Sequence, residues 1–377
     1  MIKRTLEKNI KTHLSGPKAI VIMGARQVGK TTLLKQLFEN DRQALWLNAD
    51  QLEVRTIFEG ITLNRLKAII GEKKTIIIDE AQRISDIGIK LKLIVDQIPS
   101  TKLIVTGSSS FQLSASINEP LTGRKWEYKM YPLSFKEMAQ HHGTLEEINA
   151  LEQRLLYGYY PEVVKSKGNP EKILENLTND YLYKDILEWG KIKNAAKINT
   201  LLQALALQLG NEVSYNELSR TVGLDKGTVE KYIDLLEKSF VVFTLKSFSR
   251  NIRKELRKSK KIYFYDNGIR NALIANFSPL SIRNDVGALW ENFLVMERLK
   301  FHESQEKIVN QYFWRTSNRQ EIDYIEERNG VIHAFEFKWN PSAKKKFPAS
   351  FIKAYPQHTT QIIHPGNFEN FVGLTPA

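Results

Sequence analysis

A glycine-bearing run near the N-terminus has residue types and spacing suited to holding phosphate groups. The segment from Gly24 to Thr31, GARQVGKT, fits the pattern G-x-x-x-x-G-K-[ST] at every fixed position. It follows the short apolar run Ala19–Met23 and precedes residues with helical spacing. Glycines allow backbone N–H groups to curve around phosphates, and the first turn of a helix adds the positive end of its dipole. The sequence therefore predicts a strand, a phosphate-binding loop and a helix in succession.

The polar residues of this loop have expected roles in binding ATP. Lys30 would reach the β and γ phosphates, and the Thr31 hydroxyl would be a ligand of Mg²⁺. The residues expected to contact the nucleotide are Gly24, Ala25, Arg26, Gln27, Val28, Gly29, Lys30, Thr31 and Thr32. ATP and Mg²⁺ are thus the cofactors that this loop predicts.

Two later strands would bring carboxylates and hydroxyls to the same place. Thr75–Asp79 is a largely apolar run that ends in the adjacent acids Asp79 and Glu80. Asp79 would hold Mg²⁺ through water, and Glu80 would be the general base that polarises the attacking water. A further strand ends in Thr106 and Ser108, whose hydroxyls would orient that water or sense the γ-phosphate. Hydrolysis of ATP is the reaction that this set predicts.

A second set of charged residues lies near the C-terminus. Glu336 and Lys338 fall two residues apart in an expected strand, so their side chains share a face. An Asp, here Asp323, followed across a hairpin by Glu-x-Lys is the spacing of PD-(D/E)xK nucleases. Asp323 and Glu336 would chelate Mg²⁺, with Glu291 of the preceding helix as a further acidic ligand. Lys338 would steady the hydrolytic water. The alternative is an ordinary sheet face whose alternating charges contact solvent.

The charge of the chain favours polyanionic partners. The formal net charge is +13, which attracts nucleic acid first and acidic membrane surface second. Basic residues are dense between Lys246 and Lys261, where Glu255 is the single acid. The residues expected to contact DNA are Arg250, Arg253, Lys254, Arg257 and Lys258. The alternative is a set of lysines that only face solvent. The absence of cysteine excludes disulfides, thiolate zinc sites and cysteine nucleophiles.

Short apolar runs alternate with helical patterns in the first third of the chain, which predicts a parallel sheet with helices on both faces. The expected strands are Ala19–Met23, Ala44–Asn48, Thr75–Asp79, Lys102–Gly107 and Lys125–Leu133. The expected helices are 1–15, Thr31–Phe38, Asn64–Ile70 and Ile87–Gln97.

The rest of the chain divides into a helical region, a winged helix-turn-helix and a last α/β unit. The winged helix is predicted from a helix at Ala195–Leu209, a capping box of Ser214 and Glu217, and strands at Val241–Ser247 and Ile262–Tyr265. Its expected recognition helix has mixed charge, so a protein partner is the alternative to DNA. The predicted domains are residues 1–133, 134–192, 193–270 and 271–377.

Several of these segments together resemble a known prokaryotic family. They are Gly24–Thr31, Asp79-Glu-Ala-Gln-Arg83, Thr106-Gly-Ser-Ser109, Leu121-Thr-Gly-Arg124, Tyr131-Pro-Leu-Ser-Phe135, Gly158-Tyr-Tyr-Pro-Glu162 and Lys261-Ile-Tyr-Phe-Tyr-Asp-Asn-Gly268. The chain resembles AAA+-superfamily P-loop ATPases with a DUF4143-type C-terminal region. The resemblance implies an α/β fold: an AAA+/ASCE-like parallel sheet, then a helical and winged-helix domain, then a restriction-endonuclease-like domain. It also implies Arg124 as an arginine finger or sensor, although a surface cation is equally consistent with the sequence.

Two functions follow as expectations. One is an ATPase that acts on DNA, and the other is a nucleotide-dependent switch that binds a protein partner around an inactive nuclease-like scaffold. The N-terminus lacks the apolar core of a signal peptide and the apolar runs have strand length, so a cytoplasmic protein without a membrane partner is expected. An oligomer is expected if Arg124 acts in a neighbouring copy.

Overall fold

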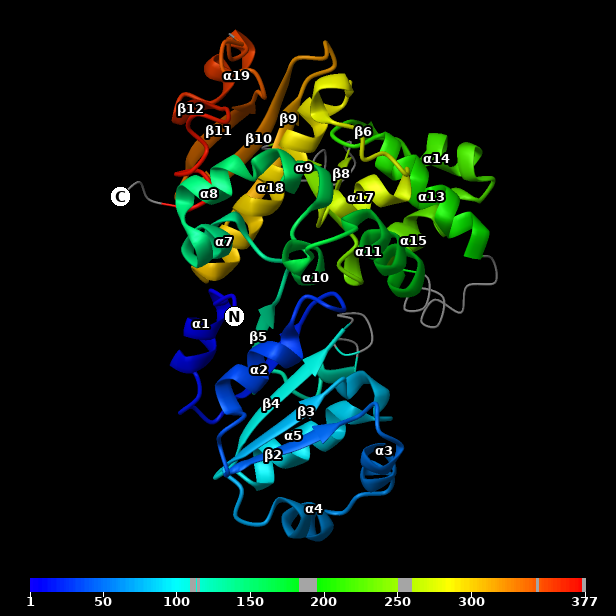
Figure 1. Cartoon of the computed structure of the whole chain (residues 1–377), viewed down its shortest axis with the longest axis vertical. Helices are drawn as coiled ribbons and strands as arrows, with labels where there is room; N and C mark the ends of the chain where they lie inside the picture. Colours follow the sequence, from blue (N-terminus) through cyan, green and yellow to red (C-terminus); the bar gives the residue numbers. More distant parts are fainter. Residues whose placement is uncertain (109–112, 114–115, 183–194, 250–259, 344–345, 375–377) are drawn as a thin grey trace. The chain divides into compact units, whose positions relative to one another are not determined.

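The computed structural model describes residues 1–108, 113, 116–182, 195–249, 260–343 and 346–374 (Figure 1). The chain forms two compact units. The first contains Met1–Leu133, and the second contains most of Ser134–Ala377.

The first unit is built around a five-stranded sheet whose neighbouring strands are all parallel. In spatial order the strands are β2 (Ala44–Asn48), β3 (Thr75–Asp79), β4 (Lys102–Gly107), β1 (Ala19–Met23) and β5 (Lys125–Lys129). Every residue of β1 and β3 is buried, which explains why these strands are nearly continuous apolar runs. Because the strands are parallel, the carboxyl ends of β1, β3 and β4 lie at one edge of the sheet.

Helices connect these strands in the alternation that the sequence predicts. They are α1 (Leu6–Thr12), α2 (Lys30–Phe38), α3 (Leu52–Phe58), α4 (Leu63–Ile70) and α5 (Ile87–Gln97), with a 3₁₀ turn at Ala81–Arg83. The strands β1 to β4 are confirmed at their predicted bounds.

Three details of the first unit differ from prediction. Helix α1 ends at Thr12 rather than at residue 15, because the backbone of His13, with a φ of -107° and a ψ of 9°, already departs from helical geometry. Strand β5 ends at Lys129 rather than Leu133, since Pro132 cannot donate to a strand ladder. Helix α3 was not predicted, and it buries only Val54 and Phe58, too few residues to give a clear period.

The second unit contains a seven-stranded mixed sheet in the order β12-β11-β10-β9-β7-β8-β6. The strands are β6 (Glu212–Val213), β7 (Val242–Ser247), β8 (Lys260–Phe264), β9 (Asn310–Arg315), β10 (Glu321–Arg328), β11 (Val331–Phe337) and β12 (His358–Ile363). Strand β8 pairs antiparallel with both β6 and β7, whereas β7 pairs parallel with β9. The sheet is therefore continuous across residue 270, where the sequence predicts a domain boundary.

The helices of the second unit surround this sheet (Figure 1). They are α7 (Phe135–His142), α8 (Thr144–Asn149), α9 (Leu151–Tyr157), α10 (Pro161–Lys165), α11 (Pro170–Asn176), a π-helix (Leu177–Leu182), α13 (Ala195–Leu207), α14 (Tyr215–Val222), α15 (Lys226–Lys238), α17 (Asn267–Leu273), α18 (Val286–Ser304) and α19 (Ala349–Ala354). Helix α18 is buried over its middle: from Leu289 to Leu299 nearly every residue is buried. Its Trp290 and Phe293 stack on each other and meet Phe368 edge-on.

Two of the segments that carry the family resemblance pack against each other. A Cβ on Gly158 would lie 2.0 Å from Oδ1 of Asp266, and Gly158 also has a φ of 72°. Asp266 caps α17 by accepting from the backbone N–H of Ile269, and it also accepts from that of Tyr159 at 2.6 Å. These residues join the end of α9 to the start of α17, so this part of the resemblance reflects packing.

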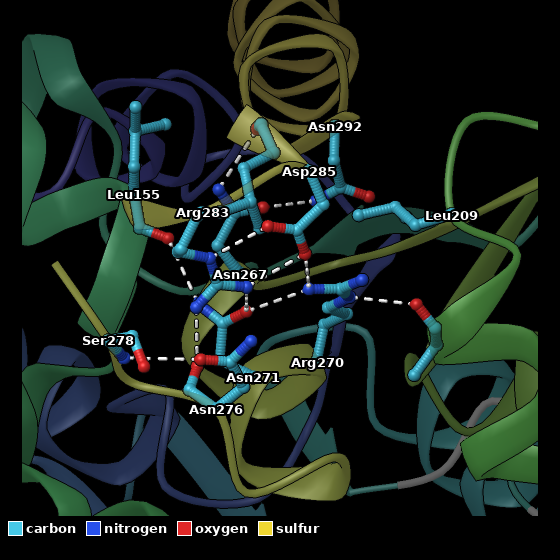
Figure 2. A network of polar contacts seen from close by, with 12 residues as sticks. Leu155, Leu209, Asn267, Arg270, Asn271, Asn276, Ser278, Arg283, Asp285 and Asn292 are labelled. Atoms are coloured by element: carbon cyan, nitrogen blue, oxygen red, sulfur yellow. Dashed lines mark hydrogen bonds and ion pairs between the residues drawn. The ribbon is translucent and has the colours of Figure 1, made fainter. Parts of the chain in front are cut away.

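A polar network extends from the same helix α17 (Figure 2). Asn271 donates to the backbone carbonyls of Leu155 and Leu156. Asp285 accepts from both Arg270 and Arg283, at 2.5 and 2.7 Å. Burial opposes ionisation of Asp285, but hydrogen bonds from Arg283 and Arg270 outweigh it and lower the pKa of Asp285 to about 2. The network anchors α9, α17 and the start of α18 with charged groups that satisfy one another.

Candidate nucleotide site and a second charged cluster

The phosphate-binding loop has the backbone geometry that its glycines permit. Gly29 has a φ of 99° and precedes α2, which begins at Lys30. A Cβ on Gly24 would lie 2.1 Å from the carbonyl oxygen of Met130, so only glycine fits there. The buried Lys30 donates from Nζ to the carbonyls of Gly24 and Ala25, at 2.9 and 2.8 Å.

The remaining residues of the loop differ in exposure. Ala25 and Val28 are buried, Arg26 is half-buried, and Gln27 is exposed with a φ of 60°. Thr32 lies in the first turn of α2 and is exposed. The loop therefore combines buried anchor residues with an exposed tip.

Thr31, Asp79 and Thr106 meet at the carboxyl edge of the sheet. Thr31 Oγ1 donates to Asp79 Oδ2 at 2.7 Å, and the Thr106 hydroxyl donates to Asp79 Oδ1. Asp79 and Thr106 are buried, and their strands β3 and β4 are adjacent. A hydroxyl and a carboxylate side by side are hard oxygen donors, which fits the donor set that Mg²⁺ prefers.

Glu80 follows with an unusual backbone. Its φ is 53°, a left-handed conformation that non-glycine residues rarely adopt, and its N–H donates to Thr106 Oγ1 at 3.2 Å. Its carboxylate accepts from Nε2 of Gln82, which also donates to Ser108 Oγ at 2.9 Å. A Cβ on Gly107 would lie 2.9 Å from Oε1 of Gln82, so glycine leaves room for this carboxamide.

Gln82 was not assigned a role from the sequence, although it lies in one of the segments that resemble the family. It links the carboxylate of Glu80 to the end of strand β4. The only available signal was its place two residues after Glu80, which by itself indicates no chemistry.

Arg124 does not lie with these residues in its own chain. It precedes β5, and its carbonyl accepts from the N–H of Ala19, which begins β1. The phosphate loop follows the other end of β1, at Met23. Arg124 instead donates from Nε to Asp96 at 2.6 Å on a partly exposed surface. Within its own chain Arg124 therefore lies apart from the phosphate loop, and a role as an arginine finger or sensor stays a prediction.

The C-terminal charged residues form a second cluster, with a member that the sequence did not single out. Lys261 on β8 is 1% exposed, and its ammonium lies 2.9 Å from Glu291 of α18 and 2.6 Å from Glu321 of β10. Tyr263 also donates to Glu291 at 2.6 Å. By sequence Lys261 ends the basic run that begins at Lys246, and the structure shows it buried among carboxylates.

The charges in this cluster shift the pKa of one another. Burial would lower the pKa of Lys261, but Glu291, Asp323 and Glu321 outweigh it and raise it. Burial raises the pKa of Glu291, and Asp323 adds to this shift against the opposing effect of Lys261. The ammonium of Lys261 therefore stays charged and stabilises the carboxylates around it.

Asp323, Glu336 and Lys338 lie together where β10 begins and β11 ends, away from the hairpin turn. Lys338 Nζ is 3.2 Å from Glu336 and 3.6 Å from Asp323, and Asp323 accepts from the N–H of Phe337. Burial would lower the pKa of Lys338, but the two carboxylates raise it. In the part of the chain that the structure describes, no three acidic or histidine side chains are arranged to hold a metal ion.

Two further expectations concern partners. Arg250, Arg253, Lys254, Arg257 and Lys258 lie outside the described residues. Within the described ranges, no helix has both the length and the apolar character needed to traverse a bilayer.

Three segments match known families. Residues 16–139 match the family described as AAA domain, residues 148–280 match a domain of unknown function (DUF8612), and residues 286–372 match a domain of unknown function (DUF4143). These matches cover both units of the chain.

Relatives align with this chain over most of their length. An uncharacterized protein of Mycobacterium tuberculosis is 26% identical over 341 residues, which cover 89% of this chain and 74% of that protein. An uncharacterized protein of Methanocaldococcus jannaschii is 24% identical over 346 residues, which cover 85% and 75%. Among solved structures, a Walker-type ATPase of Pyrococcus abyssi aligns with a TM-score of 0.51 and 17% identity, covering 73% of this chain and 96% of that one. The first unit thus has a P-loop ATPase fold and is similar to AAA domains, and residues 286–372 are similar to the DUF4143 domain.

Proposed function

We propose that the first unit binds ATP with Mg²⁺ and hydrolyses it. The observation that carries this proposal is the hydrogen bond between Thr31 and Asp79, which joins the phosphate loop to the acidic strand end. Mg²⁺ would be held there by the Thr31 hydroxyl and, through water, by Asp79, and would neutralise charge on the phosphates. The matching AAA domain over residues 16–139 supports the same activity.

The protein groups divide the work as follows. Lys30 and the loop N–H groups bind the β and γ phosphates, and the helix dipole of α2 adds to their field. Glu80 accepts the proton of the attacking water as general base. Its backbone is held by Thr106 and its carboxylate by Gln82, so its position is set by strand β4 and by the 3₁₀ turn that follows β3.

Steady-state ATP turnover tests this function. Glu80→Gln should lower turnover by about 100-fold or more while ATP still binds, because it removes only the base. Lys30→Ala should weaken ATP binding itself. Full turnover in both variants would reject the proposed site.

For the second unit we propose a winged helix that contacts DNA, so that DNA binding is coupled to nucleotide state. The order of elements from α13 through β6, α14, α15, β7 and β8 supports it, with β8 pairing between β6 and β7 as an antiparallel sheet. The basic residues of the run that begins at Lys246, without the buried Lys261, would supply charge for phosphates. Duplex affinity should fall steeply with salt, and DNA should stimulate ATP turnover. Affinity indifferent to salt would favour a protein-regulated switch.

A second candidate function for this unit is DNA cleavage. It is favoured by the proximity of Lys338 to both Asp323 and Glu336, the arrangement that such nucleases use. The competing observation is Lys261, which neutralises Glu291 without a metal. Wild type and Asp323→Ala would be compared on duplex and single-stranded DNA with Mg²⁺ or Mn²⁺. Cleavage that is lost in Asp323→Ala supports the nuclease, and equal behaviour of the two proteins rejects it.

A further inference from the structure

An arginine near the N-terminus contacts the phosphate loop from outside the recognised motif. Arg4 precedes α1, and its side chain is largely buried, with 9% of the residue exposed. One guanidinium nitrogen donates to the carbonyl of Val28 at 2.7 Å, and another donates to the carbonyl of Tyr131 at 2.6 Å. Both contacts are buried and join parts of the chain that are far apart in sequence.

The contact with Val28 satisfies a carbonyl that the shape of a phosphate loop turns toward the protein interior. When successive N–H groups turn toward an anion, the carbonyls of the same peptides turn away from it. A carbonyl directed into protein needs a donor, because a buried and unpaired carbonyl is costly. Val28 is fully buried, and Arg4 supplies the donor for its carbonyl.

The contact with the Tyr131 carbonyl holds the Arg4 side chain in position. Tyr131 follows Met130, which lies against both glycines of the loop. A Cβ on Gly24 would be 2.1 Å from the Met130 carbonyl oxygen, and a Cβ on Gly29 would be 3.7 Å from its Cε. The N–H of Met130 also donates to the carbonyl of Met23, at the start of the loop, at 2.7 Å. The loop is thus held at its beginning by Met130 and near its end by Arg4.

A separate set of contacts holds the segment that carries Arg4. Lys102, at the start of β4, donates from Nζ to the carbonyls of His13, Gly16 and Lys18. Glu7 pairs with Lys11 within α1. The N-terminal segment is therefore attached to the sheet independently of Arg4, so a change at Arg4 can act on the loop without releasing α1.

We propose that Arg4 is a positioning residue that holds the phosphate loop in its nucleotide-binding shape. This inference rests on the proposed ATP site. Arg4 acts through the carbonyl of Val28, and the planar fork of its guanidinium suits two carbonyls at once. A lysine has no such fork, so it can replace only part of the interaction.

The test measures the dissociation constant of MgATP and the turnover of the full chain. The variants are Arg4→Ala, Arg4→Lys and Arg65→Ala, the last a matched control because Arg65 is an exposed arginine on α4 of the same unit. We expect Arg4→Ala to raise the dissociation constant by about ten-fold or more, Arg4→Lys to give an intermediate value, and Arg65→Ala to leave it unchanged. Turnover at saturating ATP should change much less than affinity, since Glu80 is not displaced. The thermal midpoint measured without nucleotide should fall in Arg4→Ala, because two buried carbonyls lose their donor, so MgATP affinity is compared at a temperature at which every variant is folded.

Three outcomes separate the two levels of the proposal. Unchanged MgATP affinity in Arg4→Ala, with Lys30→Ala impaired, overturns the role of Arg4 and leaves the ATP site standing. Unchanged affinity in Lys30→Ala as well overturns the proposed function. If Arg4→Ala does not fold, Arg4→Lys decides, and wild-type affinity in that folded variant rejects the need for the two-carbonyl contact.

Discussion

Replacing Lys261 by methionine should destabilise the second unit strongly. The ammonium is buried and is shared by Glu291 and Glu321, at 2.9 and 2.6 Å. Methionine keeps most of the apolar stem, so the substitution removes the charge with little change in packing. Glu291, whose side chain is 13% exposed, would then lose its cation, whereas Glu321 would keep Arg315 at 3.1 Å.

The expected magnitude follows from burial of the pair. Removing one partner of a buried ion pair costs about 3–5 kcal/mol, because the remaining charge is left uncompensated. For a unit of this size, each kcal/mol lowers the thermal midpoint by roughly 2–4 °C, which gives a fall of roughly 6–20 °C. The matched control is Lys172→Met, which removes an ammonium whose side chain is 60% exposed beside Glu175, and it should cost less than about 1 kcal/mol.

The dependence on pH gives the sharper assay. Without Lys261, the pKa of Glu291 in the folded unit should rise further above its unfolded value. A raised carboxyl pKa costs stability when the unfolded carboxyl is ionised, and this cost shrinks as falling pH protonates the folded carboxyl. We would measure the stability of wild type and of Lys261→Met by scanning calorimetry at mildly alkaline and mildly acidic pH. The stability lost in Lys261→Met should be smaller at the acidic pH. A stability loss under about 1 kcal/mol, or a loss that is larger at acidic than at alkaline pH, would refute the reasoning.

Three further predictions concern other parts of the chain. The lowered pKa of Asp285 adds stability above its unfolded pKa of 3.8, and this stability is lost as pH falls toward about 2. The stability of Asp285→Asn should therefore depend less on pH over that range than that of wild type. An equally steep dependence in acid unfolding would contradict the network. Gly158→Ala should destabilise the second unit by more than about 1 kcal/mol in urea unfolding, because its φ is positive and its Cβ would meet Asp266, whereas alanine at the unobstructed Gly168 is the control. Gln82→Ala should lower ATP turnover about ten-fold with unchanged ATP affinity, since it frees the Glu80 carboxylate, and a change in affinity alone would argue against this role.

The sequence predicts the first unit well because its local signals agree with the fold. Buried parallel strands are nearly continuous apolar runs, so β1 and β3 are visible from composition, and each leads directly into a polar functional segment. The residues that sequence reasoning missed act through distant partners. Arg4 contacts the phosphate loop, but in the sequence it is one of several charged residues in a stretch with helical spacing. Lys261 belongs to a basic run in the sequence, whereas its ion-pair partners come from α18 and β10.

Arg124 shows a limit of another kind. The family resemblance implies an arginine finger or sensor, a surface cation is equally consistent with the sequence, and the direction of β5 decides where the residue lies. Since β5 is parallel to β1, a residue before its first position falls at the edge remote from the phosphate loop. Spacing along the chain carries no such information until the strand order and direction are known.

The parallel pairing of β7 with β9 has a consequence for how the second unit comes into being. Lys246 pairs with Tyr312, and the chain between them contains β8, α17 and α18. During synthesis β7 and β8 can form their hairpin early, but the other edge of β7 stays open until β9 emerges. Closing such a long excursion is slow, and an open strand edge invites pairing with other chains in the meantime. A fragment that stops before β9 would leave that edge of β7 unpaired permanently. The elements from α13 to β8 are therefore unlike a module that can be cut out and moved to another protein.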